Sequence, residues 1–158
     1  MKFVDSHKFV AWHRSKGFTL IEVLIVVAII GLLASIVLVG YGSFRSRGRD
    51  TRRVADLNEA QKGLELYYLK FQYYPAVAAS DSWSSLKNSL VSAGIGVNNI
   101  SNDPLAPNRT YKYGASSDFQ NYVLAATLED VSNPAFQNSP RGTIYGISCD
   151  PPNYCVQF

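Results

Sequence analysis

The feature that most constrains this chain is an uninterrupted apolar run near its N-terminus. From Val23 to Tyr41 the sequence reads VLIVVAIIGLLASIVLVGY and contains no charged residue. About 20 apolar residues in a helix suffice to cross the hydrocarbon core of a bilayer. In lipid a helix also satisfies its own backbone hydrogen bonds. The run therefore predicts a membrane-spanning helix. An ordinary secretory signal peptide is rejected, because its apolar region has only about 7–15 residues and ends in a cleavage site of small residues.

Basic residues flank the apolar run on both sides. Residues 1–17 carry a net charge of +3 and residues 45–53 a net charge of +4, whereas the chain from Val54 onward carries −3. The second basic cluster contains the arginines Arg45, Arg47, Arg49, Arg52 and Arg53. A nucleic-acid-binding domain more often spreads its basic residues over the folded surface, so nucleic acid is not supported as a partner. We interpret both clusters as contacts with lipid headgroups. Charge counting leaves the orientation open, because both flanks are basic.

Glu22 stands immediately before the charge-free run. A carboxylate at the mouth of a membrane helix is costly and usually has a partner. If the chain were cut after Gly17, Phe18 would carry a new cationic amine about one helical turn from Glu22. The same pair, formed between axially shifted subunits, would neutralise a buried charge and fix their register. The residues alone equally allow a Glu22 that lies among the headgroups and is solvated.

The segment from Lys16 to Leu24, KGFTLIEVL, resembles the cleavage and methylation signature of type IV prepilins and type II secretion pseudopilins. The resemblance implies that a prepilin peptidase cuts after Gly17 on the cytoplasmic side of the membrane and N-methylates Phe18. It implies that Glu22 and Thr19 serve assembly. It also implies the partners of that family, which are copies of the same chain, other pilins, an inner-membrane assembly platform and lipid.

The function expected from this resemblance is that of a structural subunit of a type IV pilus-like filament. Such a subunit lies first in the cytoplasmic membrane, with its N-terminus cytoplasmic and its head outside, and then in an extracellular or periplasmic filament. One alternative is a major, G-like pseudopilin of a type II secretion or DNA-uptake system. Another is an unprocessed bitopic membrane protein with an exported ligand-binding head.

Helical periodicity continues beyond the apolar run. The positions Val54, Leu57, Gln61, Leu64, Tyr68 and Phe71 follow each other at intervals of three and four residues, which predicts one buried helical face. Asp56 and Glu59 are expected on the exposed side, and Pro75 ends the helix at Tyr74. The expected parts are a leader at 1–17, a transmembrane and filament-core helix at 18–44, its amphipathic continuation at 45–74, and a globular head at 75–158.

The head is predicted to be a small antiparallel sheet, so that the fold class is α+β and pilin-like. A short helix is expected from Ser82 to Leu90, with Asp81 or Ser82 as N-cap and with Trp83, Leu86 and Leu90 on one face. Four strands are expected at 110–113, 122–127, 143–148 and 154–158, separated by turn residues. Short connections favour a meander that presents one face to the long helix.

Cys149 and Cys155 bracket the turn Asp150-Pro151-Pro152-Asn153. Across a hairpin they could come within disulfide reach, while free thiols or metal ligands remain the alternatives. A zinc site lacks further ligands, because both histidines of the chain lie in the leader. The pilin resemblance implies a disulfide between the two cysteines, close to the C-terminus.

The head shows no mark of catalysis. It contains no histidine, nucleophile elbow or phosphate-binding glycine loop, so the chain is expected not to be an enzyme and to use neither a cofactor nor a metal. The segment Glu129–Asn133 offers oxygen atoms to a cation, but we interpret it as a solvated loop. The aromatic cluster at 67–74 is expected to pack in the core and not to stack against a ligand.

Overall fold

The computed structural model describes residues 17–76 and 82–158, without the side chains of residues 36–41. The expected leader up to Lys16 and the expected N-cap at Asp81 lie outside the described residues. The chain divides into two compact units, the N-terminal unit at residues 1–41 and the head unit at residues 42–158. Each unit is described by itself.

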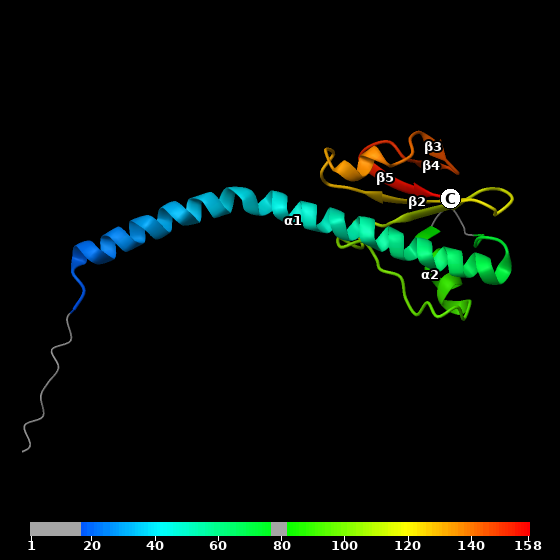
Figure 1. The fold of residues 1–158 in the computed structure, drawn as a ribbon, viewed down its shortest axis with the longest axis horizontal. Coiled ribbons are helices and arrows are strands. Elements are labelled where there is room, and N and C mark those ends of the chain that lie inside the picture. The colour runs from blue at the N-terminus through cyan, green and yellow to red at the C-terminus, as the bar shows by residue number, and fades with distance from the viewer. Residues whose placement is uncertain (1–16, 77–81) are drawn as a thin grey trace, which may run out of the picture. The chain divides into compact units, whose positions relative to one another are not determined.

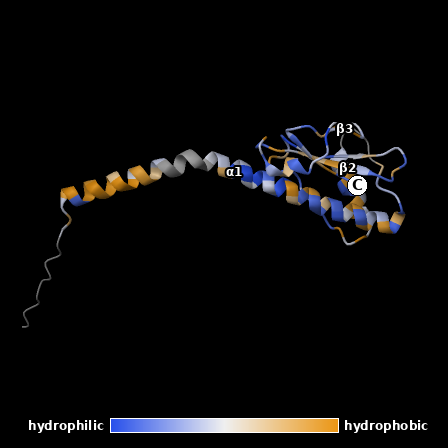
Figure 2. Ribbon diagram, turned by 45° about the horizontal axis from the view of Figure 1, so that its top comes forward, coloured by the Kyte–Doolittle hydropathy of each residue, from blue (hydrophilic) through white to orange (hydrophobic). Residues whose placement is uncertain are grey.

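Helix α1 runs from Leu20 to Phe71 (Figure 1). Its start lies two residues after the expected one, because Thr19 is still non-helical and caps the first turn. Its end lies three residues before the expected one, because Gln72 adopts a φ of 62°, a left-handed conformation that terminates helices. The colours of Figure 2 change along α1, from an almost uniformly apolar beginning to a mixture of polar and apolar positions in the head unit.

The helical residues of the N-terminal unit expose their apolar side chains. Every described large aliphatic residue from Leu20 to Leu33 is between 51% and 81% exposed. Within the part of the chain whose side chains are described, which omits 36–41, no helix is both long and apolar enough to span a membrane. The transmembrane assignment of residues 18–44 therefore stays a prediction.

The head unit contains a three-stranded antiparallel sheet in the order β1-β2-β5. Its strands are β1 (Lys112–Ala115), β2 (Tyr122–Thr127) and β5 (Asn153–Gln157). Strand β2 has the predicted bounds, whereas β1 begins two residues later than expected. Helix α2 (Ser82–Ser92) buries Trp83, Leu86 and Leu90, which confirms the predicted face.

The third expected strand, at 143–148, is wrong as a single strand. The structure divides it into β3 (Thr143–Ile144) and β4 (Ile147–Ser148), which pair with each other as a separate two-stranded sheet. Tyr145 and Gly146 turn the chain between them with φ angles of 45° and 80°. The expected four-strand meander is therefore replaced by a central sheet and a small hairpin, and a short 3₁₀ helix η2 (Pro134–Gln137) lies between β2 and the hairpin.

Strand β2 is buried on both faces, as a central strand covered from two sides should be. On one face Tyr122, Leu124 and Ala126 join the main core together with Leu57 and Leu64 of α1. On the other face Val123 and Ala125 pack with Ile147 of the hairpin and with both cysteines. Figure 1 shows β2 and β5 beside the C-terminal part of α1.

The face of α1 that meets the head is more polar than predicted. Leu57 and Leu64 are fully buried, as the periodicity predicted, but Asp56 is also buried and not exposed. Its carboxylate accepts a hydrogen bond of 2.7 Å from the Tyr111 hydroxyl. Burial and this acceptor raise the pKa of Tyr111 above its usual range, so the phenol stays protonated and donates.

Candidate functional site

The Gly17–Phe18 peptide bond lies in an exposed, non-helical stretch just before α1. Phe18 is 87% exposed, and a Cβ atom placed on Gly17 would meet no other atom within 4 Å. The fold of the chain itself therefore does not require glycine at this position. A requirement for it must come from outside the chain, for instance from a protease.

Glu22 folds back onto the residue that caps its own helix. Its Oε2 atom accepts hydrogen bonds from the backbone N–H of Thr19 at 2.8 Å and from the Thr19 hydroxyl at 2.7 Å, while the Glu22 N–H donates to Thr19 Oγ1 at 3.3 Å. This reciprocal arrangement is a capping box. The spacing Thr-x-x-Glu was visible in the sequence and could have predicted the arrangement. The hydrogen bonds use only one carboxylate oxygen, so Oε1 remains available to a cation.

A buried ion network joins α1 to two loops of the head, and sequence reasoning missed it. The Arg53 guanidinium is fully buried and contacts three carboxylates, those of Asp50 at 2.8 Å, Asp103 at 2.7 Å and Glu129 at 2.7 Å. Arg49 adds two hydrogen bonds to Glu129, of 2.7 and 2.6 Å. We call these five residues the arginine network. Only the Asp50–Arg53 pair is local, so no sequence spacing indicated the others.

Backbone amides complete the arginine network. The Asp50 carboxylate accepts hydrogen bonds from the N–H groups of Glu129 and Asp130, each at 2.9 Å. Burial alone would lower the pKa of Arg53, but its hydrogen bonds to the three carboxylates raise that pKa above the usual range. The hydrogen bonds from Arg49 and then Arg53 lower the pKa of Glu129 to about 2. Arg53 and Glu129 therefore stay charged at neutral pH.

Two predictions are corrected by this network. Arg49 and Arg53 were expected to contact lipid headgroups, but their guanidinium groups are held by carboxylates of the protein. Glu129 was expected in a solvated loop, but its side chain is only 17% exposed and both oxygens accept hydrogen bonds from arginine. Among the residues that the structure describes, no group of His, Cys, Asp and Glu side chains is arranged to hold a metal ion.

The two cysteines of the chain are bonded to each other in the structure. Cys155 lies on β5 opposite Ala125 of β2, and Cys149 follows directly after β4. The bond therefore joins the small hairpin to the edge of the central sheet.

The aromatic cluster at the end of α1 divides into two groups. Tyr74 is fully buried, and its ring contacts Tyr68 and Tyr122 at centroid distances of 4.8 and 4.6 Å. This half of the cluster packs in the core as predicted. Tyr73 is instead 44% exposed, and its ring contacts those of Tyr67 and Phe71; of these, Tyr67 is partly buried and also packs against the main core.

The N-terminal segment matches a known protein family. Residues 12–38 match the family model described as the prokaryotic N-terminal methylation motif. This match includes the Gly17–Phe18 bond and the capping box. No solved structure matches the chain significantly.

Curated relatives extend the similarity beyond that motif. A probable minor fimbrial protein of Dichelobacter nodosus is 31% identical over 143 residues, which cover 84% of this chain and 77% of the relative. The type IV wide pilus major component PilA4 of Thermus thermophilus is 38% identical over 82 residues, covering 52% and 56%. Core protein G of the type II secretion system of Escherichia coli is 32% identical over 65 residues, covering 41% and 45%.

The chain thus spans only about half the length of the Thermus and Escherichia relatives, but more than three quarters of the Dichelobacter protein. The methylation motif, the long N-terminal helix and the small antiparallel sheet agree with that similarity. The chain therefore belongs to the type IV pilin and pseudopilin family.

Proposed function

We propose that this chain is a structural subunit of a type IV pilus-like filament. The subunit is inserted in the cytoplasmic membrane with residues 1–17 on the cytoplasmic side. It is cleaved after Gly17, methylated on Phe18 and polymerised through α1. The name of the Thermus relative, a major component of a wide pilus, supports a place in the filament body.

The observation that carries the proposal is the apolar surface of residues 20–33. The large aliphatic side chains of this segment are at least half exposed in the single chain, whereas a stable water-soluble protein rarely exposes so continuous an apolar surface. Lipid can cover this surface in the membrane. Outside the membrane, only other apolar surfaces can cover it, and identical helices supply them in a homopolymer.

Glu22 is a charged residue at the beginning of this apolar surface. After cleavage the amine of Phe18 would be cationic and would lie close to the capping box. Oε2 of Glu22 already accepts hydrogen bonds from Thr19, so the amine of a neighbouring subunit would pair with Oε1. Both carboxylate oxygens would then accept hydrogen bonds. Neutralising the carboxylate in this way lowers the cost of burying it in a filament core.

The primary test is mass spectrometry of the N-terminus of the native protein. We expect a chain that begins with N-methylated Phe18. A native chain that retains residues 1–17 would contradict the proposal and favour the unprocessed bitopic protein.

Variants at Glu22 separate charge pairing from helix capping. Glu22→Ala should leave membrane insertion intact and impair assembly. Glu22→Gln keeps an oxygen that can accept from Thr19 but removes the charge, so it should impair assembly as well. Thr19→Ala removes the hydroxyl and keeps the charge, and should assemble better than either. Normal filament yield from Glu22→Gln would show that pairing with an amine is not needed.

A pseudopilin of a secretion or DNA-uptake system is the second candidate, and the similarity to core protein G favours it specifically. Both candidates share processing and polymerisation. Electron microscopy of the native cells distinguishes them, because only a pilin forms long surface fibres at its natural expression level. The proposal assigns the head no catalytic role, and the names of the relatives support this.

A further inference from the structure

A polar groove of the head unit lies between α1 and the loop that follows β2. Its volume is about 360 Å³, and it is lined by Arg47, Thr51, Asp130, Ser132, Asn133 and Pro134. Sites for small ligands commonly have volumes of about 300 to 1,000 Å³. Arg47 and Asp130 are the charged residues of this lining, so the groove offers a cation and an anion side by side. We call it the Arg47–Asp130 groove.

The two charged groups of the groove hold each other loosely. Arg47 Nε lies 3.4 Å from the Asp130 carboxylate, whereas a charge-assisted hydrogen bond between nitrogen and oxygen is usually about 2.7–2.9 Å long. The Arg47 side chain is 65% exposed in this contact. Arg49 of the arginine network, by contrast, contacts Glu129 at 2.6 Å and is 31% exposed. A ligand that carries both charges can therefore separate Arg47 from Asp130 at little cost.

Asp130 is oriented by its own loop. Its Oδ1 atom accepts hydrogen bonds from the backbone N–H of Ser132 at 2.9 Å and from the Ser132 hydroxyl at 2.5 Å. These hydrogen bonds lower the pKa of Asp130, so the carboxylate is ionised at neutral pH. Its other oxygen, Oδ2, is the atom that faces Arg47. The groove therefore presents a fixed acceptor beside an exposed guanidinium group.

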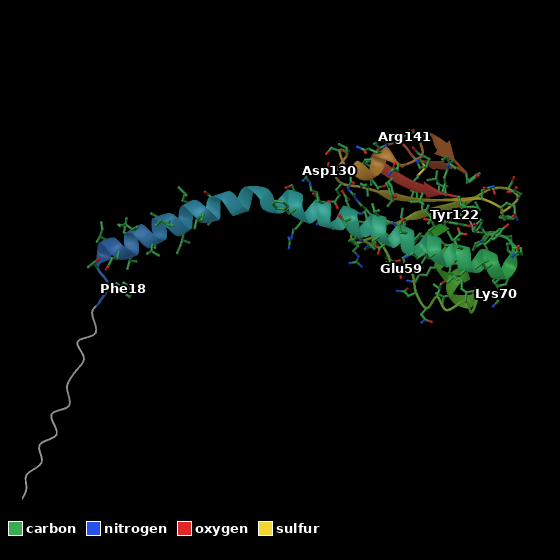
Figure 3. The ribbon with its side chains drawn as sticks, viewed as in Figure 1. Phe18, Glu59, Lys70, Tyr122, Asp130 and Arg141 are labelled. Atoms are coloured by element: carbon green, nitrogen blue, oxygen red, sulfur yellow. A yellow bond between two sulfur atoms is a disulfide. The ribbon has the colours of Figure 1, made fainter. Side chains whose placement is uncertain are left out.

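Exposed apolar side chains lie beside both charged residues. Phe44 is 70% exposed and lies one helical turn before Arg47, while Val131 is 68% exposed and follows Asp130 in the loop beside α1 (Figure 3). In the sequence, Phe44 comes shortly after the apolar run that ends at Tyr41. Apolar side chains next to basic ones are typical of protein surfaces that lie at the boundary between headgroups and acyl chains. If the apolar run is inserted in the membrane as proposed, the residues of α1 that follow it lie among the headgroups.

We propose that the Arg47–Asp130 groove binds a phospholipid headgroup that carries a phosphate and a primary ammonium, as in phosphatidylethanolamine. The planar guanidinium group of Arg47 matches the phosphate with paired N–H donors. Oδ2 of Asp130 accepts a hydrogen bond from the ammonium, and Phe44 and Val131 contact the acyl chains.

The aspartate determines which headgroup fits the groove. A purely anionic headgroup is disfavoured, because Asp130 repels it. The trimethylammonium group of phosphatidylcholine has the right charge but no N–H to donate. The inference rests on the proposed function, because the subunit must first lie in a membrane, and it adds to that function a selective contact with one class of lipid.

Lipid retention by the full-length protein tests the site. The protein is reconstituted in bilayers that contain equal amounts of phosphatidylethanolamine, phosphatidylcholine and phosphatidylglycerol, and is then released in mild detergent. Native mass spectrometry counts the lipids that stay bound. We expect phosphatidylethanolamine to exceed each of the other lipids by up to about fivefold, the usual range for an exposed ion pair. Equal retention of the three lipids would overturn the proposal.

Variants of the groove separate its two charges. Arg47→Gln should reduce the retention of phosphatidylethanolamine, because it removes the partner of the phosphate. Asp130→Asn keeps an oxygen that accepts from Ser132 but removes the charge, so it should abolish the preference over phosphatidylcholine and increase the retention of phosphatidylglycerol. Arg52→Gln is the matched control and should retain lipid as the wild type does, because Arg52 is a similarly exposed arginine of α1 that pairs with Asp56.

A soluble competitor distinguishes a lipid from a free compound with the same headgroup. Glycerophosphoethanolamine has this headgroup without acyl chains, and in an amount equal to the lipid it should not displace phosphatidylethanolamine. Displacement would overturn the lipid as the occupant.

The remaining outcomes separate this site from the proposed function. An unchanged lipid preference in Asp130→Asn, or an equal loss in Arg52→Gln, would overturn the site and leave the filament function intact. A full-length protein that does not enter bilayers at all would overturn the proposed function and the lipid site with it.

Discussion

Removal of the Glu129 carboxylate should show most clearly how much the arginine network contributes to the stability of the head. Its hydrogen bonds from Arg49 and Arg53 lower its pKa from an ordinary value of 4.5 to about 2. By linkage, this difference corresponds to about 3 kcal/mol of stability at neutral pH. Glu129→Gln removes the charge and keeps the shape, so it should lower the free energy of unfolding at pH 7 by about 3 kcal/mol.

The pH dependence gives the sharper test. Since the pKa is lowered in the folded state, the contribution is fully present above pH 4.5 and is lost as the pH falls toward 2. The difference in unfolding free energy between wild type and Glu129→Gln should shrink from about 3 kcal/mol at pH 7 to about 1 kcal/mol at pH 3. Urea denaturation of both full-length proteins in detergent, followed by tryptophan fluorescence, measures this difference in unfolding free energy.

A matched control excludes general effects of acid. Glu59 is an exposed glutamate of α1 (Figure 3), and Glu59→Gln should differ from wild type by less than about 0.5 kcal/mol at every pH. If the curves of wild type and Glu129→Gln ran parallel from pH 7 to pH 3, the ion pairs of Glu129 would contribute nothing, and the reasoning would be refuted.

Two further substitutions test the packing of the head by thermal or urea unfolding. Arg53→Met should cost about 3–5 kcal/mol, because it leaves buried carboxylates without their cation; a loss below about 1 kcal/mol would mean that water replaces the guanidinium. Gly114→Ala should cost about 1–3 kcal/mol, because the new Cβ would lie 2.8 Å from the carbonyl oxygen of Tyr145. Gly48→Ala is its control, since that helical glycine has open space around it, and it should instead gain up to about 1 kcal/mol; similar losses from both would argue against the steric reason.

Local patterns predicted the elements whose structure is set locally. The turn residues on either side of Tyr122–Thr127 predicted β2, and the spacing of Trp83, Leu86 and Leu90 predicted the buried face of α2. The hairpin of β3 and β4 escaped prediction because its turn uses Tyr145 before Gly146, where asparagine or aspartate would have signalled a turn.

Contacts between distant residues could not be predicted in this way. Asp56 was assigned to the exposed face because periodicity treats every aspartate as polar, and its partner Tyr111 lies 55 residues away. Arg53 meets Asp103 and Glu129 across 50 and 76 residues. At the N-terminus the candidate site can be predicted from sequence, because Thr19 and Glu22 of the capping box are three residues apart and the motif around Gly17 is continuous in the chain.

The arginine network also determines where the chain can be shortened. Arg49 and Arg53 stand on the same helix as the apolar surface, yet the loops of the head need their charges. A fragment that begins after Arg53 would bury Asp103 without a counter-ion and lose the anchor of both loops. A water-soluble fragment for crystallisation should therefore start between residues 42 and 48, which removes the apolar segment and retains Arg49 and Arg53.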